Sequence, residues 1–328
     1  QGVYDFSARY AKAWRDRFAI KLNASYLSGL DWYAVNYTDV SAATPPNMRG
    51  PNNPGRDALN IYGDEVSKTM PGIGLVTRTG YEEQNLMNYD VYSLKLNGSL
   101  HYRISNNLEA IYQYNFGKGT ASYTGSSRFD LNNFVLQTHR IELKGTHFFL
   151  RSYMVEENSH DSYNTRSLAQ FINRDWVQDL SGNVVAPNEA DNMWFTRYEE
   201  AFNGNIGGVS AGNHGAARAF ADQGRFLPGS TAFDAAKDRS IHNYGLNGAG
   251  VFSNSKFYHT EGQYDLSKWV NVVELLAGGS FRYYDMFTNG TLFDDKDKEI
   301  TIKEYGAFVQ AAKSLLNEKL KLTASIRY

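Results

Sequence analysis

The chain contains 328 residues, and its 33 basic and 35 acidic side chains give a formal net charge of −2. Charges of both signs are interspersed without a basic block, which excludes a nucleic-acid-binding protein, and the absence of cysteine excludes disulfides and thiolate chemistry. Aromatic residues reach 14%, with 23 Tyr and 19 Phe, as is typical of all-β proteins that expose belts of aromatic rings. No segment has the roughly 18 consecutive apolar residues of a membrane-spanning helix.

Alternation of apolar and polar residues dominates the chain, and it places successive side chains on opposite faces of a sheet. The clearest predicted strands are residues 18–26, 92–104 and 320–328. Weaker alternation predicts further strands at 4–10, 108–116, 134–144, 148–155, 256–266, 272–283 and 304–311. Most approach the roughly 9–11 residues with which a tilted strand crosses a bilayer, whereas strands of soluble proteins average about five or six residues.

Short turns alternate with long loops between these strands. The turns lie at 15–17, 105–107, 145–146, 267–268 and 316–318, and the loops span 27–87, 117–133, 156–255 and 285–302. Outer-membrane barrels have this rhythm, with short turns in the periplasm and long loops outside the cell. We therefore predict an all-β fold, a transmembrane antiparallel β-barrel in the cell outer membrane; the alternative is a soluble sandwich or propeller.

Several side chains are assigned to a face by this pattern. Aromatic residues at strand ends are expected in the two interfacial girdles, where an amphipathic ring meets both lipid tails and headgroups: Tyr26, Tyr102, Phe116, Tyr153 and Tyr283. Polar residues of the opposite parity are expected to face the lumen, among them Lys21, Arg103, Gln113 and Arg327. Their mixed charge indicates no particular class of ligand.

The loop at 156–255 is too long to lack structure in a compact protein. Helical spacing predicts a helix at 166–180 and weaker helices at 192–202 and 216–226. We therefore predict that 156–255 is an extracellular cap inserted into a barrel segment that covers 1–328.

Aromatic residues of the cap are the candidate substrate-binding residues, because their rings could stack on sugars or grip peptide side chains. They are Tyr163, Trp176, Trp194, Phe195 and Tyr198. The alternative is that these rings form the small core that a loop of this length needs.

Turn lengths also predict the direction of the strands. A short periplasmic turn joins the first two strands and another joins the last two, so both chain ends would lie on the extracellular side. A complete barrel has both ends in the periplasm, and we therefore expect a partial barrel of about ten strands. One observation argues against a partial barrel. The sequence has alternating apolar positions at Ile326 and Tyr328, and a barrel often ends in an aromatic residue after such alternation.

Five segments resemble the barrel of TonB-dependent receptors of the Bacteroidota SusC/RagA-like type: 9–12, 18–26 followed by Asp31 and Trp32, 148–151 followed by 157–159, 304–310 and 319–325. The resemblance implies about 22 strands around a plug domain. It further implies uptake driven by the TonB–ExbB–ExbD complex, and a SusD-like surface lipoprotein as a possible partner. The plug and the TonB box of this family are not found in the sequence.

Two motifs that could carry chemistry are better explained otherwise. Residues 208–212 match the G-x-S-x-G elbow, but the buried strand that should precede it is missing, which favours a Gly-rich loop. Asp294, Asp295 and Asp297 are a weak calcium candidate, and a solvated acidic loop tip is expected instead. No cofactor is predicted.

The sequence thus predicts a TonB-dependent receptor or transporter that imports a bulky nutrient, such as a glycan, peptide or metal chelate, and is not an enzyme. One alternative is an outer-membrane protease or hydrolase, for which His160 and Asp161 lie just beyond a strand end. The other is a scaffold barrel that docks surface lipoproteins.

Overall fold

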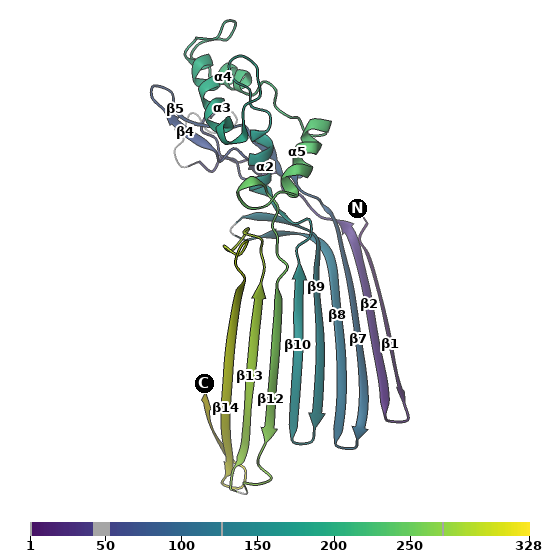
Figure 1. Cartoon of the computed structure of the whole chain (residues 1–328). Coiled ribbons are helices and arrows are strands. Elements are labelled where there is room, and N and C mark those ends of the chain that lie inside the picture. The colour runs from purple at the N-terminus through teal and green to yellow at the C-terminus, as the bar shows by residue number, and fades with distance from the viewer. Residues whose placement is uncertain (1, 42–52, 126, 271) are drawn as a thin grey trace.

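A computed structural model of the chain describes residues 2–41, 53–125, 127–270 and 272–328. Its main feature is one antiparallel sheet below a helical cap (Figure 1). Neighbours in the sheet are also neighbours along the chain: β1 (Tyr4–Trp14), β2 (Phe18–Leu30), β7 (Asp90–Ser105), β8 (Leu108–Thr124), β9 (Arg128–Gly145), β10 (Phe148–Asn158), β12 (Lys256–Asp265), β13 (Glu274–Met286), β14 (Ile300–Leu315) and β15 (Leu320–Arg327). The short β11 (Tyr163–Asn164) pairs with the outer end of β9.

The ten strands predicted from alternation are confirmed, but one predicted loop is wrong. Strands β8 and β9 continue through most of 117–133, since β8 ends at Thr124 and β9 begins at Arg128. The register shifts between Gly119 and Ala121, and a Cβ atom at Gly119 would lie 2.6 Å from the Tyr92 carbonyl oxygen. Glycine at this bulge lets the hairpin bend. The alternation of apolar and polar residues fades in the outer part of the hairpin because that part lies beyond the apolar band.

One face of the sheet, here called the apolar face, presents hydrophobic side chains across its width. The register pairs Ile20 with Leu100, Leu100 with Tyr112, and Tyr112 with Ile141, so four neighbouring strands contribute to one row. These side chains remain uncovered: 46% of Leu22 and 60% of Ile141 are exposed.

The exposed area of the molecule reflects this uncovered face. The accessible surface is 19298 Å², whereas a compact monomer of 37.0 kDa has roughly 13,600 Å² by the usual scaling of area with mass. A soluble sandwich would bury the apolar face against a second sheet, and no second sheet covers it in the described part of the chain. The soluble alternative is therefore not favoured.

Aromatic rings frame the apolar face toward both ends of the strands. Near the short turns, Trp14 contacts Phe18, and Tyr264 stacks between Phe148 and Trp269, with ring centroids 5.3–6.2 Å apart. From Phe18 to Tyr26 at the other end is about 27 Å along the strand, close to the roughly 25 Å apolar band of an outer-membrane barrel.

Four of the five predicted girdle residues lie on the apolar face, because Tyr26, Tyr102, Phe116 and Tyr283 share its register. The prediction for Tyr153 is wrong. Tyr153 is paired with Arg140 and His259 on the opposite face, because its position in β10 has the parity of Arg151.

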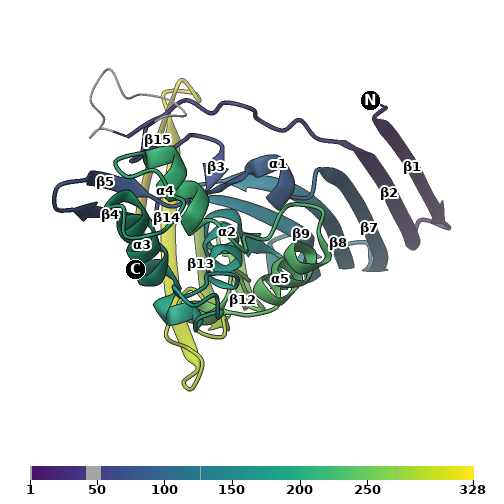
Figure 2. The same cartoon turned by 90° about the horizontal axis from the view of Figure 1, so that it is seen from above.

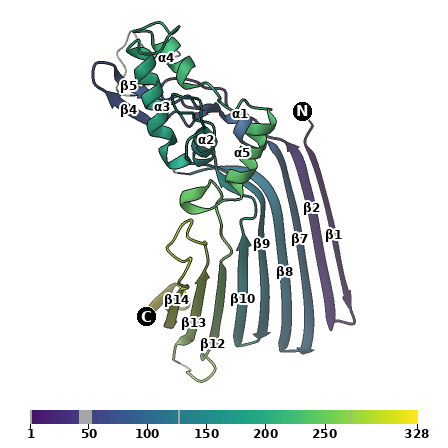
Figure 3. The same cartoon turned by 45° about the horizontal axis from the view of Figure 1, so that its top comes forward.

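The cap is built from two loops. The first contributes β3 (Ile61–Tyr62), β4 (Ser67–Met70), β5 (Gly74–Thr77), β6 (Tyr81–Glu82) and α1 (Glu83–Leu86); the second contributes β11, α2 (Thr165–Arg174), α3 (Pro187–Phe202), α4 (His214–Ala221), α5 (Thr231–Ile241) and the 3₁₀ turn η2 (Gly245–Asn247). Seen from above, the sheet is curved and the cap lies over its end (Figures 2 and 3). Among the described residues, none of the helices is long and apolar enough to cross a membrane.

Three of the cap helices begin at a residue whose side chain caps the helix. Asn164, Asn213 and Ser230 accept hydrogen bonds from the backbone N–H groups three residues later, at the starts of α2, α4 and α5. The predicted helix at 166–180 ends at Arg174, and α5 was not predicted from the sequence, although Ser230 is a recognisable capping residue.

We predict that Leu100→Arg destabilises the folded protein in lipid by about 2–4 kcal/mol, because it places a charge near the middle of the apolar face. Gln113→Arg, on the neighbouring strand but on the opposite face, serves as the control. The measurement is the urea midpoint of the full-length protein in phospholipid vesicles. Equal destabilisation by both variants would refute the assignment of the faces.

Candidate functional site

The face opposite the apolar face, here called the polar face, carries a connected row of charged groups across five strands. Arg140 pairs with Glu142, Arg151 pairs with Glu261, and Arg282 Nη1 lies 3.2 Å from the Glu304 carboxylate. Each of these arginines thus has a carboxylate partner on its own or the adjacent strand, so charge is balanced along the row.

His259 links two neighbouring ion pairs in the middle of this charged row, those of Glu261 and Arg282. Its Nδ1 lies 3.3 Å from Arg282 Nε and its Nε2 lies 3.5 Å from Glu261, while its ring stacks on Tyr153 at a centroid distance of 5.0 Å. Only 5% of His259 is exposed. The row is therefore closely packed around His259, whereas the Arg282 and Glu304 side chains are about half exposed.

The other half of the polar face carries a row of amides. Asn23 Nδ2 donates to Asn97 Oδ1 at 2.7 Å, Asn97 Nδ2 donates to Asn115 Oδ1 at 2.5 Å, and Gln113 Nε2 also reaches Asn115 at 3.3 Å. Asn97 thus uses both its oxygen and its nitrogen within the row, whereas Asn23 uses only its nitrogen and Asn115 only its oxygen. The Asn23 oxygen and the Asn115 nitrogen are available to a polar ligand.

Burial differs between the two faces. Ser99, Glu142 and His259 on the polar face are buried, whereas the large side chains of the apolar face are exposed. Side chains converge on the concave side of a curved sheet and diverge on the convex side, so this contrast places the polar face on the concave side. Lys21, Arg103, Gln113 and Arg327 all lie on this face by register, as their parity predicted. The bonds in either row could not be predicted from the sequence, because they depend on which strands are neighbours.

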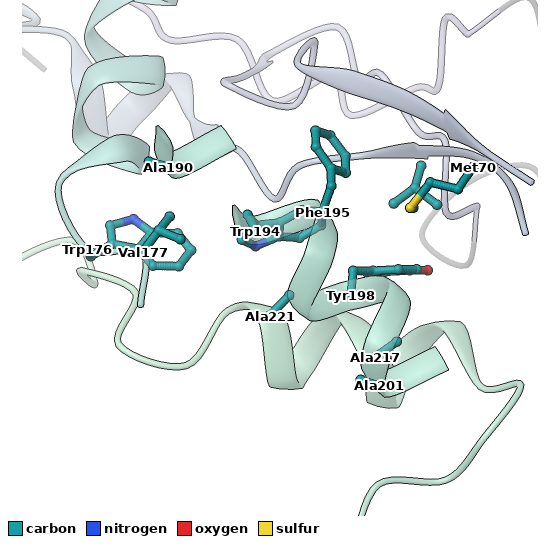
Figure 4. Close-up of a cluster of buried hydrophobic side chains, with 11 residues drawn as sticks. Met70, Trp176, Val177, Ala190, Trp194, Phe195, Tyr198, Ala201, Ala217 and Ala221 are labelled. Carbon is teal, nitrogen blue, oxygen red and sulfur yellow. The ribbon is translucent and has the colours of Figure 1, made fainter. Parts of the chain in front are cut away.

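The five aromatic residues predicted to bind substrate lie elsewhere, inside the cap. Trp176, Trp194, Phe195 and Tyr198 form one hydrophobic cluster with Met70 and Val76 (Figure 4), and Tyr163 belongs to a second cluster with Tyr81 and Phe233. None of the five is more than 3% exposed. Their rings have no free face for a ligand, which corrects the binding assignment and gives them a role in the core of the cap.

Arg78 connects the two loops that build the cap. Its guanidinium lies 5.3 Å from the Trp176 ring and 5.7 Å from the Trp194 ring, and Nη1 lies 2.5 Å from the Asp191 carboxylate. Nη2 donates to the Asn173 carbonyl oxygen at 2.8 Å. Burial lowers the pKa of Arg78, and the nearby Asp191 carboxylate opposes that effect.

Two further arginines hold the backbone of the first loop. Arg218 donates to the carbonyl oxygens of Thr77 and Pro54, both at 2.8 Å, and Arg225 donates to the Gly80 carbonyl oxygen at 2.6 Å. These contacts join residues more than 140 positions apart. The cap is therefore a single folded unit.

The cap is fixed to the sheet at the outer end of β9. The Glu83 carboxylate accepts from the Tyr89 hydroxyl at 2.8 Å and lies 3.2 Å from Arg128 of β9. The Tyr163 hydroxyl lies 2.7 Å from both the Asp130 carboxylate and the Leu86 carbonyl oxygen. Strand and cap thus share buried polar contacts.

The remaining candidate motifs are placed as follows. Residues 208–212 form turns with positive φ at Gly208 and Gly212, and no strand precedes them. Asp295 is buried and accepts from the Thr288 and Gly290 N–H groups at 2.5 and 2.7 Å, which is a loop-closing role. In the described ranges, no three His, Cys, Asp or Glu residues gather to hold a metal; calcium at Asp294, Asp295 and Asp297 stays an untested prediction.

No hydrogen bond or ion pair joins the side chains of His160 and Asp161, the residues considered for hydrolysis. Asp161 lies 3.8 Å from His242 Nε2 and accepts from Asn133 at 3.3 Å. His160 is exposed, and its backbone N–H donates to Asn158.

No family model matches the chain, and no curated protein matches it. Two solved structures of the ferric enterobactin receptor PfeA, a mutant from Pseudomonas aeruginosa and a complex with BCV-L6, are 10% identical with TM-scores of 0.49 and 0.45, each over 99% of this chain and 36% of that chain. Acinetobacter baumannii OccAB4 is 8% identical with a TM-score of 0.25, over 98% of this chain and 60% of that chain. The chain thus spans little more than a third of the PfeA structures.

We predict that Arg78→Met destabilises the cap by about 1–3 kcal/mol, because it leaves the buried Asn173 carbonyl oxygen without its donor, whereas the Asp191 carboxylate keeps its ion pair with Arg174 at 2.8 Å. Trp176 and Trp194 flank the site, so tryptophan fluorescence during urea unfolding of the full-length protein reports the change. The control is Arg239→Met, which removes an exposed ion pair with Asp175 and should cost no more than about 0.5 kcal/mol. Equal destabilisation by both variants would contradict the role of Arg78 in joining the two loops of the cap.

A second prediction concerns pH. Asp64 is buried in the first loop and accepts from the Ala58 N–H at 2.9 Å, and burial raises the pKa of its carboxyl to about 8. The unfolded chain releases this proton near pH 4, so the contribution of Asp64 is full below about pH 4 and is lost as the pH rises toward 8.

Asp64→Asn should therefore reduce the loss of cap stability between pH 5 and pH 8. Hydrogen exchange of the amides in 58–64, corrected for intrinsic exchange rates, measures this loss in both proteins. The same pH dependence with and without the carboxyl would rule out Asp64 as its source.

Proposed function

We propose that the chain forms part of the wall of a β-barrel in the bacterial outer membrane, and that this barrel transports a solute. The observation that supports this is the division of one long-stranded sheet into an uncovered apolar face and a bonded polar face. An uncovered apolar face of about bilayer height is stable in lipid, whereas the polar face suits a water-filled interior.

The free sheet edges support the further proposal that strands from outside this sequence complete the barrel. Strands β1 and β15 are the outermost described strands and do not pair with each other. In hydrocarbon, each unbonded backbone N–H or C=O costs several kcal/mol, so a spanning sheet must close on itself. The sequence resemblance leads us to propose about 22 strands around a plug domain.

The same resemblance leads us to propose that import is energised by TonB–ExbB–ExbD. A glycan, peptide or metal chelate too bulky for a porin is the proposed class of nutrient. The cap lies on the side of the long loops, so we propose that it faces outside the cell, where a SusD-like lipoprotein could dock. We propose no enzymatic activity, since His160 and Asp161 are not arranged as a catalytic pair.

The test is uptake by cells that carry the full-length gene, in matched strains with and without TonB. Candidate glycans, peptides and ferric chelates are supplied as sole sources of carbon, nitrogen or iron. We expect that growth on the imported nutrient is lost with either deletion, of this gene or of TonB. Uptake that requires this gene but continues unchanged without TonB would refute energised import and leave a passive channel.

A further inference from the structure

The amide row lies in a groove of the polar face that is basic. The groove crosses β1, β2, β7, β8 and β9, and its polar lining includes Arg9, Asn23, Lys95, Asn97, Asn115 and Thr138. No carboxylate lines it. Within the described residues, neither Arg9 nor Lys95 has an acidic group within ion-pair distance.

Register brings these groups close together. Arg9 is paired with Asn23, Asn23 with Asn97, and Asn97 with Asn115, whereas Lys95 lies two residues from Asn97 on the same face. With strands about 4.8 Å apart and residues about 3.4 Å apart along a strand, the Cα atoms of Arg9 and Lys95 are separated by about 12 Å. Their long side chains can reach the same small molecule.

The contrast with the charged row makes this arrangement informative. In that row, Arg140, Arg151 and Arg282 are neutralised by carboxylates on the polar face. The carboxylates nearest the groove by register are Asp5, two residues from Ser7 along β1, and Glu157, which is paired with Leu136 and accepts from the Ser253 hydroxyl. Lys21, two residues from Asn23 on the same face, lies just outside the groove, and among the described residues no carboxylate lies within ion-pair distance of it.

We propose that this basic groove binds a small molecule that carries several oxyanion groups, carboxylate or phosphate, and thereby selects anionic solutes for transport. Arg9 and Lys95 supply charge, and the free donors of the amide row bind oxygen atoms between them. The inference rests on the proposed function only in treating the polar face as the transport path.

The test is calorimetric titration of the full-length protein in detergent micelles with citrate and with inorganic triphosphate, as separate carboxylate and phosphate probes. The double variant Arg9→Gln/Lys95→Gln should bind the preferred probe about tenfold more weakly. Lys12→Gln/Lys303→Gln, which removes two cations from the apolar face, should remain within about twofold of the unaltered protein. Arg9→Lys/Lys95→Arg should restore binding, which separates a charge effect from misfolding.

Two outcomes would overturn the proposal: no binding of either probe to the unaltered protein, or equal weakening by the groove variant and the apolar-face control. Binding in micelles does not involve TonB. Anion binding together with TonB-independent uptake would therefore refute the proposed energised import but not the proposed anion site. Absence of anion binding together with TonB-dependent uptake would refute the anion site alone.

Discussion

Because successive residues of a strand face opposite sides of the sheet, the register that pairs Ile20 with Leu100 also pairs Asn23 with Asn97. A slip of one residue would move the amide row onto the apolar face and the leucines onto the polar face. The strands that carry these pairs, β2 and β7, are joined by the long first loop of the cap, so the hydrophobic pattern of the two strands specifies their register. Tight turns join other neighbouring strands, and at 15–17 and 316–318 the backbone adopts positive φ at non-glycine residues to make them. The rows of charge, amide and hydrocarbon all depend on the register of the strands.

The cap depends on a different interaction, the burial of arginine side chains between its two loops. Arg78, Arg218 and Arg225 bond to carbonyl oxygens or a carboxylate and lie against aromatic rings. A planar guanidinium can use its face and its edge at the same time, which a lysine ammonium cannot do. The aromatic residues are thus needed to hold the cap together and are not free to bind a ligand.

The features that could be predicted from the sequence are those that depend only on residues close together in the chain. Alternation identifies a strand from its own residues, and the parity of Lys21 or Arg103 then gives its face. The outer part of the hairpin of β8 and β9, within 117–133, was taken for a loop because it has no lipid to impose alternation. Tyr153 and the cap aromatics were misassigned because residue type alone does not say whether a ring is buried. The bonds of Asn97 and Arg78 require knowledge of which strands and loops are neighbours.

The construction of the cap has a consequence for the order of folding. Arg78 and Asp191 are 113 positions apart, and four strands, β7 to β10, lie between the two loops that these residues join. Closing so long a loop in an open chain is entropically costly, and it becomes much less so once those strands are paired. Pairing of β7 to β10 therefore brings the two loops close together, and the cap forms late in folding, after these strands have paired.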